Sequence, residues 1–262
     1  MSIGILTIAT NIYIDYWKKL ALSIDITTDN SSSITLHVFT DQVESVQIFA
    51  RTLTKVEVIT HEIESLGWPD ATLRRYEIFS RFLPEILEPI VVYLDADMIV
   101  KRDISSDIYG ALSSSKIALV SHPGFWRKNH ASEIASSTRD VKSFLIALKT
   151  VLIRKKRGAW EDNKSSTAFV PKKYRKVYVC GGTWMGHRSE MFSLILTLKE
   201  AVAQDSANGI IAKWHDESHL NCWAATNEYN LLDPSYCFVT EYRHLSSLDA
   251  KIIAVTKDLK TR

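Results

Sequence analysis

The chain has 262 residues, of which 46% are hydrophobic and 24% are charged, a composition typical of an ordinary globular domain. Nine glycines and six prolines are too few for a linker-rich, collagen-like or low-complexity chain. The 32 basic and 30 acidic residues give a formal net charge of +2. This balance excludes a protein that coats nucleic acid through its overall charge, but not one that binds a small phosphate-bearing substrate.

Strand-like and helix-like patterns alternate along the first half of the chain. The predicted strands cover residues 5–10, 34–40, 55–60 and 89–97, and the predicted helices run through Trp17 and Leu20 and over residues 70–83. Such alternation predicts an α/β fold with a mostly parallel central sheet and helices on both faces. In the helix over 70–83, Asp70 is the expected cap and Pro84 the expected stop. Arg74 and Arg75 lie off its apolar stripe, so they can reach a site.

The second half of the chain continues the same kind of pattern. The expected elements are a strand at 116–122, an amphipathic helix from Phe144 to Leu152, a strand at 177–182 that ends in glycines, and a helix that buries Met191, Leu194, Ile195, Leu198 and Val202. We find neither an internal repeat nor a domain boundary in the sequence. We therefore predict a single domain over residues 1–262, with a mobile insertion near Gly158 to Ser166.

Cysteine usage and the amino-terminal segment bear on the compartment. Cys180, Cys222 and Cys237 form no CxxC pair, and their odd number and wide spacing indicate reduced thiols. The amino-terminal apolar run lacks a preceding basic region and a cleavage site, so it is typical of a buried strand and not of a signal peptide. Since no stretch approaches the ~20 apolar residues that cross a bilayer, we predict a cytoplasmic protein with at most peripheral contact to the inner face of the membrane.

The segment from Val91 to Asp97 is an apolar strand that ends in two carboxylates separated by one small residue. Ligands of open α/β sheets bind at the carboxyl ends of strands, and extended residues two apart project to the same side. Asp95 and Asp97 can therefore share one divalent cation, Mn²⁺ or Mg²⁺, whose other ligands are water and phosphate oxygens. Such a cation would stabilise the charge on a departing nucleoside diphosphate. The alternative is that both aspartates only cap the strand.

A second polar cluster spans Trp214 to Ala224. A helix is expected to start near Asp216, and its inward-facing residues are expected to be Leu220 with Trp223 or Ala224. Glu217 then lies in the first turn, as a carboxylate beside imidazole and indole rings in a cleft.

The two histidines of this cluster suggest other interpretations. His215 and His219 are four residues apart, as in a zinc protease, but the HExxH motif requires Glu directly after the first histidine and this chain has Asp216 there. In a purely structural interpretation, Asp216 is a helix N-cap and His219 is a core residue.

Three further segments have both functional and structural interpretations. The glycines of Cys180-Gly181-Gly182 can let a ligand approach the backbone, or let a strand turn into a helix. The aromatic residues of the segment His122 to Trp126 can stack on a sugar, or belong to the core. The basic residues at 154–157 and 172–176 can attract anionic headgroups or a lipid-linked diphosphate, or form a solvated face.

Taken together, these segments resemble glycosyltransferase family 6, which contains the histo-blood-group ABO transferases, the α-1,3-galactosyltransferases and their bacterial relatives. The resemblance is an ordered series of motifs from about Thr35 to Lys257. Its blocks are His37 to Gln42, Trp68 to Glu77, Asp95 to Met98, His122 to Phe125, Cys180 to Gly182, Ala207 to Ile210, Trp214 to Asn221 and Ala254 to Lys257.

This resemblance implies a GT-A fold and the transfer of galactose or N-acetylgalactosamine from a UDP-sugar, with retention, to O3 of an acceptor galactose. It divides the single domain into a donor-nucleotide half, about 1–115, and an acceptor and catalytic half, about 116–262. The implied donor-binding residues are Tyr13, Arg75, Asp95, Ala96, Asp97, Cys180, Gly181, Gly182, Asp216 and Lys257. The implied acceptor contacts are His122, Trp214 and Glu217, with Glu217 as the catalytic carboxylate and Asp95 and Asp97 as the metal ligands.

The resemblance also bears on the metal and on the donor. Many bacterial members of the family carry Asn-x-Asn at the metal site and work without metal, whereas this chain keeps Asp95 and Asp97 and is predicted to need Mn²⁺ or Mg²⁺. Cys180 and Gly182 match the donor-selecting positions. Glycine in place of alanine leaves room for an acetamido group and favours UDP-GalNAc over UDP-Gal, although Cys180 departs from the best-known mammalian pattern.

The implied acceptor is a galactose-terminated oligosaccharide, fucosylated or not and lipid-linked or not, in lipopolysaccharide O-antigen or another surface glycan. No nucleic acid is an expected partner. The alternative from another functional class is a non-catalytic module of the same fold that binds a nucleotide sugar or a glycan.

Overall fold

The computed structural model of the chain describes residues 2–29, 31–67, 69–127, 141, 145 and 158–255. Several predicted features lie outside these residues: Trp68, the basic group at 154–157, Lys257, and the helix from Phe144 to Leu152 except for Leu145.

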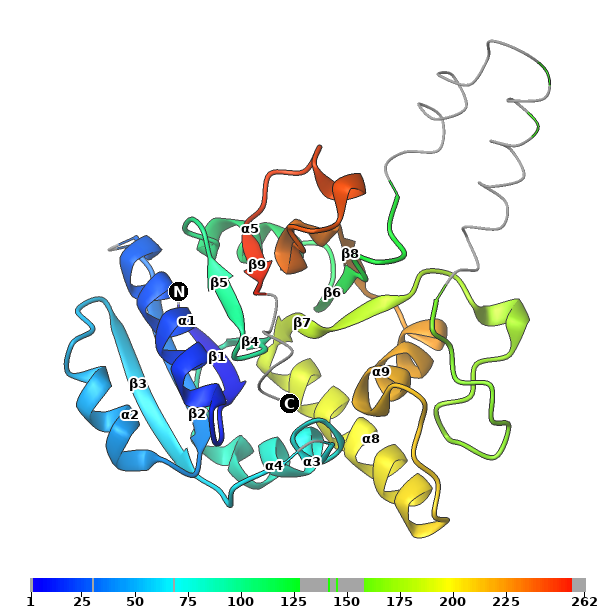
Figure 1. Cartoon of the computed structure of the whole chain (residues 1–262), viewed down its shortest axis with the longest axis horizontal. Coiled ribbons are helices and arrows are strands. Elements are labelled where there is room, and N and C mark those ends of the chain that lie inside the picture. Colours follow the sequence, from blue (N-terminus) through cyan, green and yellow to red (C-terminus); the bar gives the residue numbers. More distant parts are fainter. Residues whose placement is uncertain are drawn as a thin grey trace.

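Seven strands in the described part of the chain form the central sheet, in the order β3-β2-β1-β4-β7-β6-β8 (Figure 1). All neighbouring strands are parallel except that β7 runs antiparallel to both β4 and β6. In chain order, and with β5 and β9 of a second sheet included, the strands are β1 (Ser2–Ile8), β2 (Ser33–Thr40), β3 (Val56–Glu62), β4 (Ile90–Leu94), β5 (Met98–Val100), β6 (Ile117–Ser121), β7 (Val179–His187), β8 (Asn230–Leu232) and β9 (Ile252–Ala254). A separate two-stranded sheet pairs β5 with β9. The prediction of a mostly parallel sheet is confirmed.

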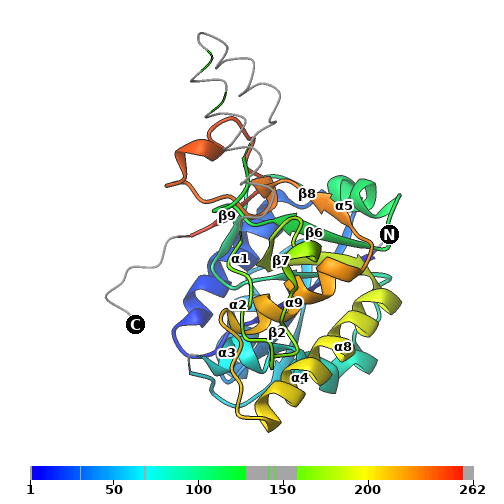
Figure 2. The ribbon, with the colours of Figure 1, turned by 90° about the vertical axis from the view of Figure 1, so that its right-hand side faces the viewer.

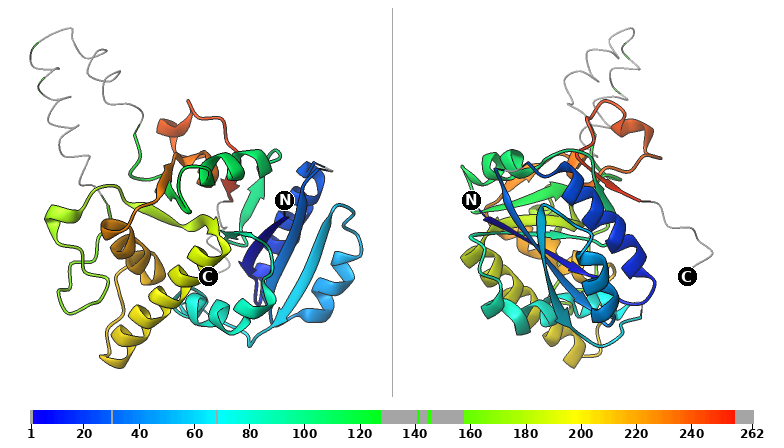
Figure 3. Two further views of the ribbon diagram at one scale, coloured as in Figure 1. Left: turned by 180° about the vertical axis from the view of Figure 1, so that it is seen from behind. Right: turned by 90° about the vertical axis from the view of Figure 1, so that its left-hand side faces the viewer.

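Helices cover both faces of the sheet, as predicted. The α-helices are α1 (Tyr13–Thr27), α2 (Val43–Ala50), α3 (Asp70–Leu73), α4 (Arg75–Phe82), α5 (Ser105–Leu112), α8 (Arg188–Ala207) and α9 (His215–Thr226). Short 3-10 turns are η1 (Leu83–Glu85), η2 (Lys172–Tyr174), η3 (Pro234–Cys237) and η4 (Arg243–Leu245). Figure 2 and the right-hand view of Figure 3 show α1 on one side of the sheet and α4 and α8 on the other.

The alternation of side chains along β4 explains these two layers. Ile90, Val92 and Leu94 face one apolar core, which they share with α1, α2 and α5. Val91 and Tyr93 face a second core with α4, α8 and α9. Because both faces are buried, β4 is continuously apolar, which is typical of a central strand in an α/β sheet.

Three sequence predictions are wrong in detail. The helix expected over 70–83 is divided at Arg74, whose backbone leaves helical geometry between α3 and α4, and it ends as the 3-10 turn η1. The strand expected to end at its glycines continues as β7 to His187, because β4 and β6 pair with it on both sides. The stretch from Gly158 to Ser166 is packed against the domain, since Trp160 and Glu161 are only 3% and 6% exposed.

The glycine pair of β7 lies where the strand pairing is irregular. Pairing with β6 is regular up to Leu119 opposite Trp184, and resumes with Ser121 opposite Val179. Gly181 and Gly182 lie in the stretch between, where residues 180–183 of β7 stand opposite Val120 alone, an irregularity larger than an ordinary β-bulge. Irregularities of this kind are common beside functional sites because they redirect side chains.

Strand direction brings the candidate site residues to one edge of the sheet. The strands β1, β4 and β6 run in the same direction, because β1 is parallel to β4, and β4 and β6 are both antiparallel to β7. The carboxyl ends of these three strands therefore meet the amino end of β7. The helices of the described ranges include none that is both long enough and apolar enough to cross a membrane.

Candidate active site

The predicted acid pair lies at this edge, directly after β4. The Asp95 backbone N–H donates to the carbonyl of Gly182 at 3.0 Å, which continues the pairing of β4 with β7. The Asp97 carbonyl accepts a hydrogen bond from the Val255 N–H at 2.8 Å. Val255, which follows β9, therefore lies beside this acid pair. Lys257, two positions after Val255, lies outside the described residues.

Arg75 joins two of the predicted acidic residues into one cluster. One guanidinium nitrogen donates to Asp95 Oδ1 at 2.9 Å, and the other donates to Asp216 Oδ2 at 2.5 Å and to the Gly181 carbonyl at 3.1 Å. The side chains of Arg75 and Asp216 are only 6% and 7% exposed. Burial alone would lower the pKa of Arg75, but the charge of Asp216, with the other groups around it, raises that pKa above its ordinary value. The cation of this cluster is therefore permanent.

Glu217 lies on the other side of Gly181. Its Oε2 accepts a hydrogen bond from the Gly181 N–H at 2.8 Å, and its side chain is also hydrogen-bonded to Tyr178. A Cβ on Gly181 would lie 3.1 Å from the Cβ of Glu217, so glycine allows the helix to approach the strand this closely. Glu217 lies in the first turn of α9, as predicted, and α9 buries Leu220.

Burial raises the pKa values of both carboxyl groups at the start of α9. The pKa of Glu217 is raised to about 7, although the Gly181 N–H acts in the opposite direction. The pKa of Asp216 is raised to about 6, against the effect of Arg75. Two acids with shifted pKa values at the edge of a sheet indicate a functional site.

The raised pKa of Glu217 predicts that Glu217→Gln stabilises the protein at alkaline pH. A carboxyl group whose pKa rises on folding stabilises the folded state fully only below its unfolded pKa of about 4.5, and this contribution is lost as pH rises through about 7. Glutamine keeps an oxygen for the Gly181 N–H and carries no charge. We expect the variant to unfold at the same temperature as the wild type at pH 4, and to be more stable by about 1–3 kcal/mol at pH 8. Thermal unfolding across this pH range measures the difference, and an equal gain at both pH values would contradict it.

The predicted acceptor contacts lie next to this cluster. His122 follows β6, and its backbone N–H donates to the Tyr178 carbonyl at 2.9 Å. Burial lowers the pKa of His122 to about 4, so its ring is neutral at pH 7. Phe125 packs on the rings of His122 and Tyr178, which supports the structural interpretation for this aromatic residue. Trp214 is 52% exposed immediately before α9, where it is available to a ligand.

The two histidines of α9 have separate partners. His215 Nδ1 lies 3.1 Å from the Thr72 hydroxyl, whereas His219 Nε2 lies 3.6 Å from Asp205. His219 is 2% exposed, which agrees with its interpretation as a core residue. Asp216 lies within the first turn of α9 and is not its N-cap, because Trp214 occupies that position.

The space beside Gly182 is not free for a donor sugar. A Cβ at this position would lie 2.7 Å from Asp95 Oδ2 and 2.9 Å from Met98 Cε. The space that the sequence analysis assigned to an acetamido group is therefore taken by the protein's own carboxylate, and the argument for UDP-GalNAc from Gly182 does not hold. Cys180 lies beside it, with its Sγ 3.1 Å from Sγ of Cys237, and both thiols are reduced.

Tyr13 begins α1, just after the carboxyl end of β1. Since Leu6 in β1 pairs with Tyr93 in β4, the loop before Tyr13 shares the edge of the sheet with Asp95. Tyr13 is half-buried against the core under α1 and α2, and its ring lies 5.9 Å from that of Tyr16. This position is compatible with the predicted contact to a base.

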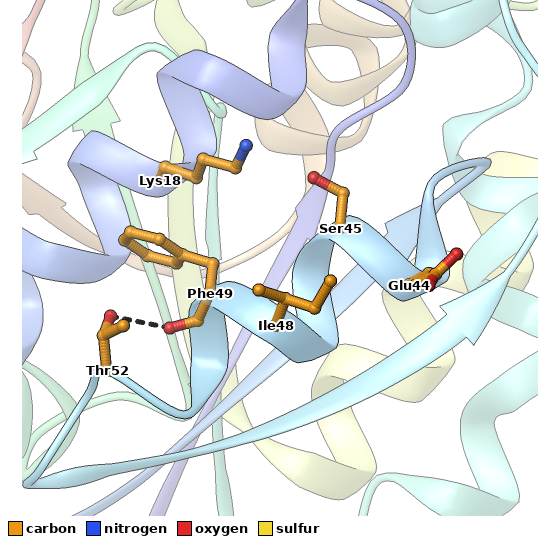
Figure 4. A pocket seen from close by; sticks show the side chains of 6 residues that line it. All are labelled: Lys18, Glu44, Ser45, Ile48, Phe49 and Thr52. Atoms are coloured by element: carbon orange, nitrogen blue, oxygen red, sulfur yellow. Dashed lines mark hydrogen bonds between the residues drawn. The ribbon is translucent and has the colours of Figure 1, made fainter.

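A cavity of about 440 Å³ between α1 and α2 is distinct from this cluster (Figure 4). The residues that line it are Lys18, Glu44, Ser45, Ile48, Phe49 and Thr52. None of them is a predicted site residue. The shifted carboxylates and the buried arginine lie at the edge of the sheet, so this edge, and not the cavity, is the candidate active site.

Asp95 and Asp97 fit a divalent cation that is shared with a ligand. Among the described residues we find no group of three or more His, Cys, Asp or Glu side chains that could hold a metal by themselves. A cation at the acid pair would take its remaining ligands from phosphate oxygens and water, which Mg²⁺ and Mn²⁺ accept. The hydrogen bonds that Asp95 accepts from Arg75 and Tyr93 both use Oδ1, so a cation at this site would meet Oδ2.

Sequence reasoning missed three residues that build the site: Tyr93, Tyr178 and Asn221. The Tyr93 hydroxyl donates to Asp95 Oδ1. Asn221 accepts from the Val179 N–H at 2.8 Å and donates to the Val179 and Glu217 carbonyls, which ties α9 to the start of β7. A signal was present for Tyr93, since it is a polar residue in an apolar strand and lies two positions before Asp95 on the same side.

Comparisons with known proteins find glycosyltransferases among the relatives of this chain. The family model described as glycosyltransferase family 6 matches residues 146–261. The chain is 26% identical to histo-blood group ABO system transferase 1 of Rattus norvegicus over 264 residues, which cover 98% of this chain and 67% of that protein. It is 26% identical to the O-antigen biosynthesis glycosyltransferase WbnI of Escherichia coli over 98% of this chain and 96% of that protein. Human globoside alpha-1,3-N-acetylgalactosaminyltransferase 1 is 22% identical over 90% of this chain and 60% of its own length.

Proposed function

Because this chain belongs to glycosyltransferase family 6, we propose that it is a retaining α-1,3-glycosyltransferase that moves galactose or N-acetylgalactosamine from a UDP-sugar to O3 of an acceptor galactose. The observation that carries this proposal is the buried Asp95–Arg75–Asp216 cluster beside Glu217, at the carboxyl ends of β1, β4 and β6. This arrangement supplies a diphosphate site, a fixed cation and a carboxylate within one edge of the sheet.

The donor side of the reaction needs charge neutralisation. Asp95 and Asp97 are the residues that would hold Mn²⁺ or Mg²⁺, and a bound cation supplies positive charge for the diphosphate oxygens. Arg75 keeps Asp95 and Asp216 at fixed positions through two ion pairs. In the proposed complex, Asp216 accepts hydrogen bonds from hydroxyl groups of the donor sugar, and Tyr13 packs on the uracil ring.

The transfer step needs a carboxylate near the anomeric carbon of the donor sugar. As the bond from that carbon to the diphosphate breaks, its electron pair leaves with UDP, and positive charge develops on the sugar ring. Glu217 faces this charge either as a nucleophile or as an electrostatic stabiliser, and both roles require its ionised form. His122 and Trp214 line the approach of the acceptor, whose O3 forms the new bond and gives its proton to the departing diphosphate of UDP.

The names of the relatives indicate the class of donor and acceptor. One relative is an O-antigen biosynthesis glycosyltransferase and another an alpha-1,3-N-acetylgalactosaminyltransferase. We propose the same class of substrates here: UDP-Gal or UDP-GalNAc as donor, and a galactose-terminated surface oligosaccharide as acceptor. We also propose a cytoplasmic enzyme that reaches a lipid-linked acceptor from the inner face of the membrane.

Calorimetry with UDP and an assay of UDP release together test this proposal. We expect UDP to bind more tightly with Mn²⁺ than with EDTA, by about tenfold or more, because a cation held by Asp95 and Asp97 would supply positive charge for the diphosphate. Incubation with UDP-Gal or UDP-GalNAc and galactose-terminated acceptors should then release UDP and form an α-1,3 linkage. Binding without release for every donor and acceptor tried would favour a non-catalytic binding module instead.

A further inference from the structure

A buried stack of side chains lies behind the acid pair. The Tyr93 ring lies 5.0 Å from the Trp184 ring at an interplanar angle of 26°, and the Arg75 guanidinium carbon lies 4.3 Å from the centre of the Tyr93 ring. Tyr93 and Trp184 are 2% and 0% exposed. The Trp184 indole N–H also donates to the Gly181 carbonyl at 3.2 Å, so the stack is fixed to β7.

The polar end of this stack contacts Asp95. The Tyr93 hydroxyl and one Arg75 nitrogen both donate to the same carboxylate oxygen, Oδ1. The Asp95 backbone is held independently, through its N–H and the Gly182 carbonyl. With the backbone and one oxygen fixed, rotation of the carboxylate about its last bond is restricted.

The second oxygen of Asp95 is thereby directed. Oδ2 lies over Gly182, at the place where a side chain of any other residue would begin. The Asp95 side chain is 34% exposed, whereas Oδ1 is covered by two donors. Oδ2 is therefore the oxygen that Asp95 offers to a cation.

We infer that Tyr93 is a positioning residue for the divalent cation, because its hydroxyl holds Asp95 Oδ1 and thus presents Oδ2 to the metal. This inference rests on the proposed function, which supplies the cation and the diphosphate. Hydrogen bonds to the ligands of a metal typically change its affinity by about 10–100-fold. Tyr93 acts through Asp95 and touches neither the metal nor the sugar.

The variant Tyr93→Phe removes the hydroxyl and keeps the ring in the stack. We expect its affinity for Mn²⁺, measured by calorimetry in saturating UDP, to fall by about tenfold or more. UDP binding in EDTA should equal that of the wild type. A merely structural role would instead weaken UDP binding equally with and without metal.

Tyr236→Phe is the matched control. Tyr236 is 5% exposed and its hydroxyl lies 2.7 Å from Lys251 Nζ, so the variant also loses a buried hydroxyl group but leaves Asp95 untouched. Its Mn²⁺ affinity should equal that of the wild type. Thermal unfolding of each variant without ligand verifies that it is folded.

Gly182→Ala tests the same oxygen from the other side. Its Cβ would lie 2.7 Å from Oδ2, and the carboxylate must turn away to make room. We expect Mn²⁺ affinity to fall here as well. An unchanged affinity would show that Oδ2 is not the oxygen that meets the cation, and would overturn the inference even if Tyr93→Phe does not fold.

The outcomes separate this inference from the proposed function. If wild-type UDP binding depends on Mn²⁺ but either folded variant, Tyr93→Phe or Gly182→Ala, binds Mn²⁺ as well as the wild type, the inference is overturned and the proposed metal site stands. If the wild type binds UDP equally in Mn²⁺ and in EDTA, the proposed metal site is overturned, and the inference with it.

Discussion

Replacing Glu217 by glutamine is expected to lower turnover by about 10²–10⁴-fold while UDP binding is retained. Glutamine has nearly the same shape and keeps an acceptor for the Gly181 N–H, so α9 and β7 stay together. What it lacks is the negative charge that both proposed roles of this residue require. Steady-state turnover with saturating donor and acceptor, beside calorimetry with UDP and Mn²⁺, measures the two quantities separately.

The pH dependence of the wild type gives an independent measure of the same group. Because burial raises the pKa of Glu217 to about 7, its active ionised form dominates only above that pH, and turnover should rise with pH through this value. For the comparison with Glu217→Gln, the variant Glu88→Gln is a suitable control for the loss of a buried carboxyl group. Glu88 is 8% exposed and contacts His37 and not the site. Near-normal turnover of the Glu217→Gln variant would remove Glu217 from a catalytic role.

Chelation of divalent metal is expected to abolish transfer, and added Mn²⁺ should restore it. Asp95→Asn should lower turnover by about 10²-fold or more, because the single amide oxygen of asparagine can accept from Tyr93 and Arg75 only if the NH₂ group, which cannot coordinate a cation, takes the place of Oδ2. Transfer assays in EDTA, followed by titration with Mn²⁺, test the first expectation. Thermal unfolding distinguishes loss of the metal from loss of the fold in the variant.

Asp103→Asn provides the control for this second prediction. Asp103 accepts a hydrogen bond from the Ser105 N–H at 2.8 Å at the start of α5, so its replacement changes local stability and leaves the acid pair intact. Its turnover and its metal dependence should match those of the wild type. Full activity of the wild type in EDTA would mean that Asp95 and Asp97 only terminate β4.

Local patterns were sufficient to predict much of this protein. The strand β4 and the acid pair after it could be predicted from the seven residues Val91 to Asp97, because an apolar run followed by two carboxylates two positions apart is a local pattern. The same holds for α8, whose buried residues Met191, Leu194, Ile195 and Leu198 repeat at helical spacing. The position of Glu217 in the first turn of α9 also follows from neighbouring residues alone.

Features that depend on pairing between distant segments were not predictable. Nothing in the sequence of β7 shows that it runs antiparallel between β4 and β6, so its glycines were taken as the end of a strand. For the same reason the space at Gly182 was assigned to a sugar, when Asp95 fills it from another strand. The role of Tyr93 depends on Arg75, which reaches it from α4 and is distant in sequence.

The irregular pairing of β7 decides which hydrophobic core each part of the strand faces. Before the glycine pair, Val179 faces the core under α4 and α8, and Cys180 faces the core under α1. Beyond it the order is reversed, since Trp184 faces the former and Met185 the latter. In a regular strand of the same length Val179 and Cys180 would face the opposite sides, because Val179 precedes Trp184 by an odd number of positions. Both ends of β7 can thus pack into the same two cores, while the glycines between them meet Asp95 and Glu217.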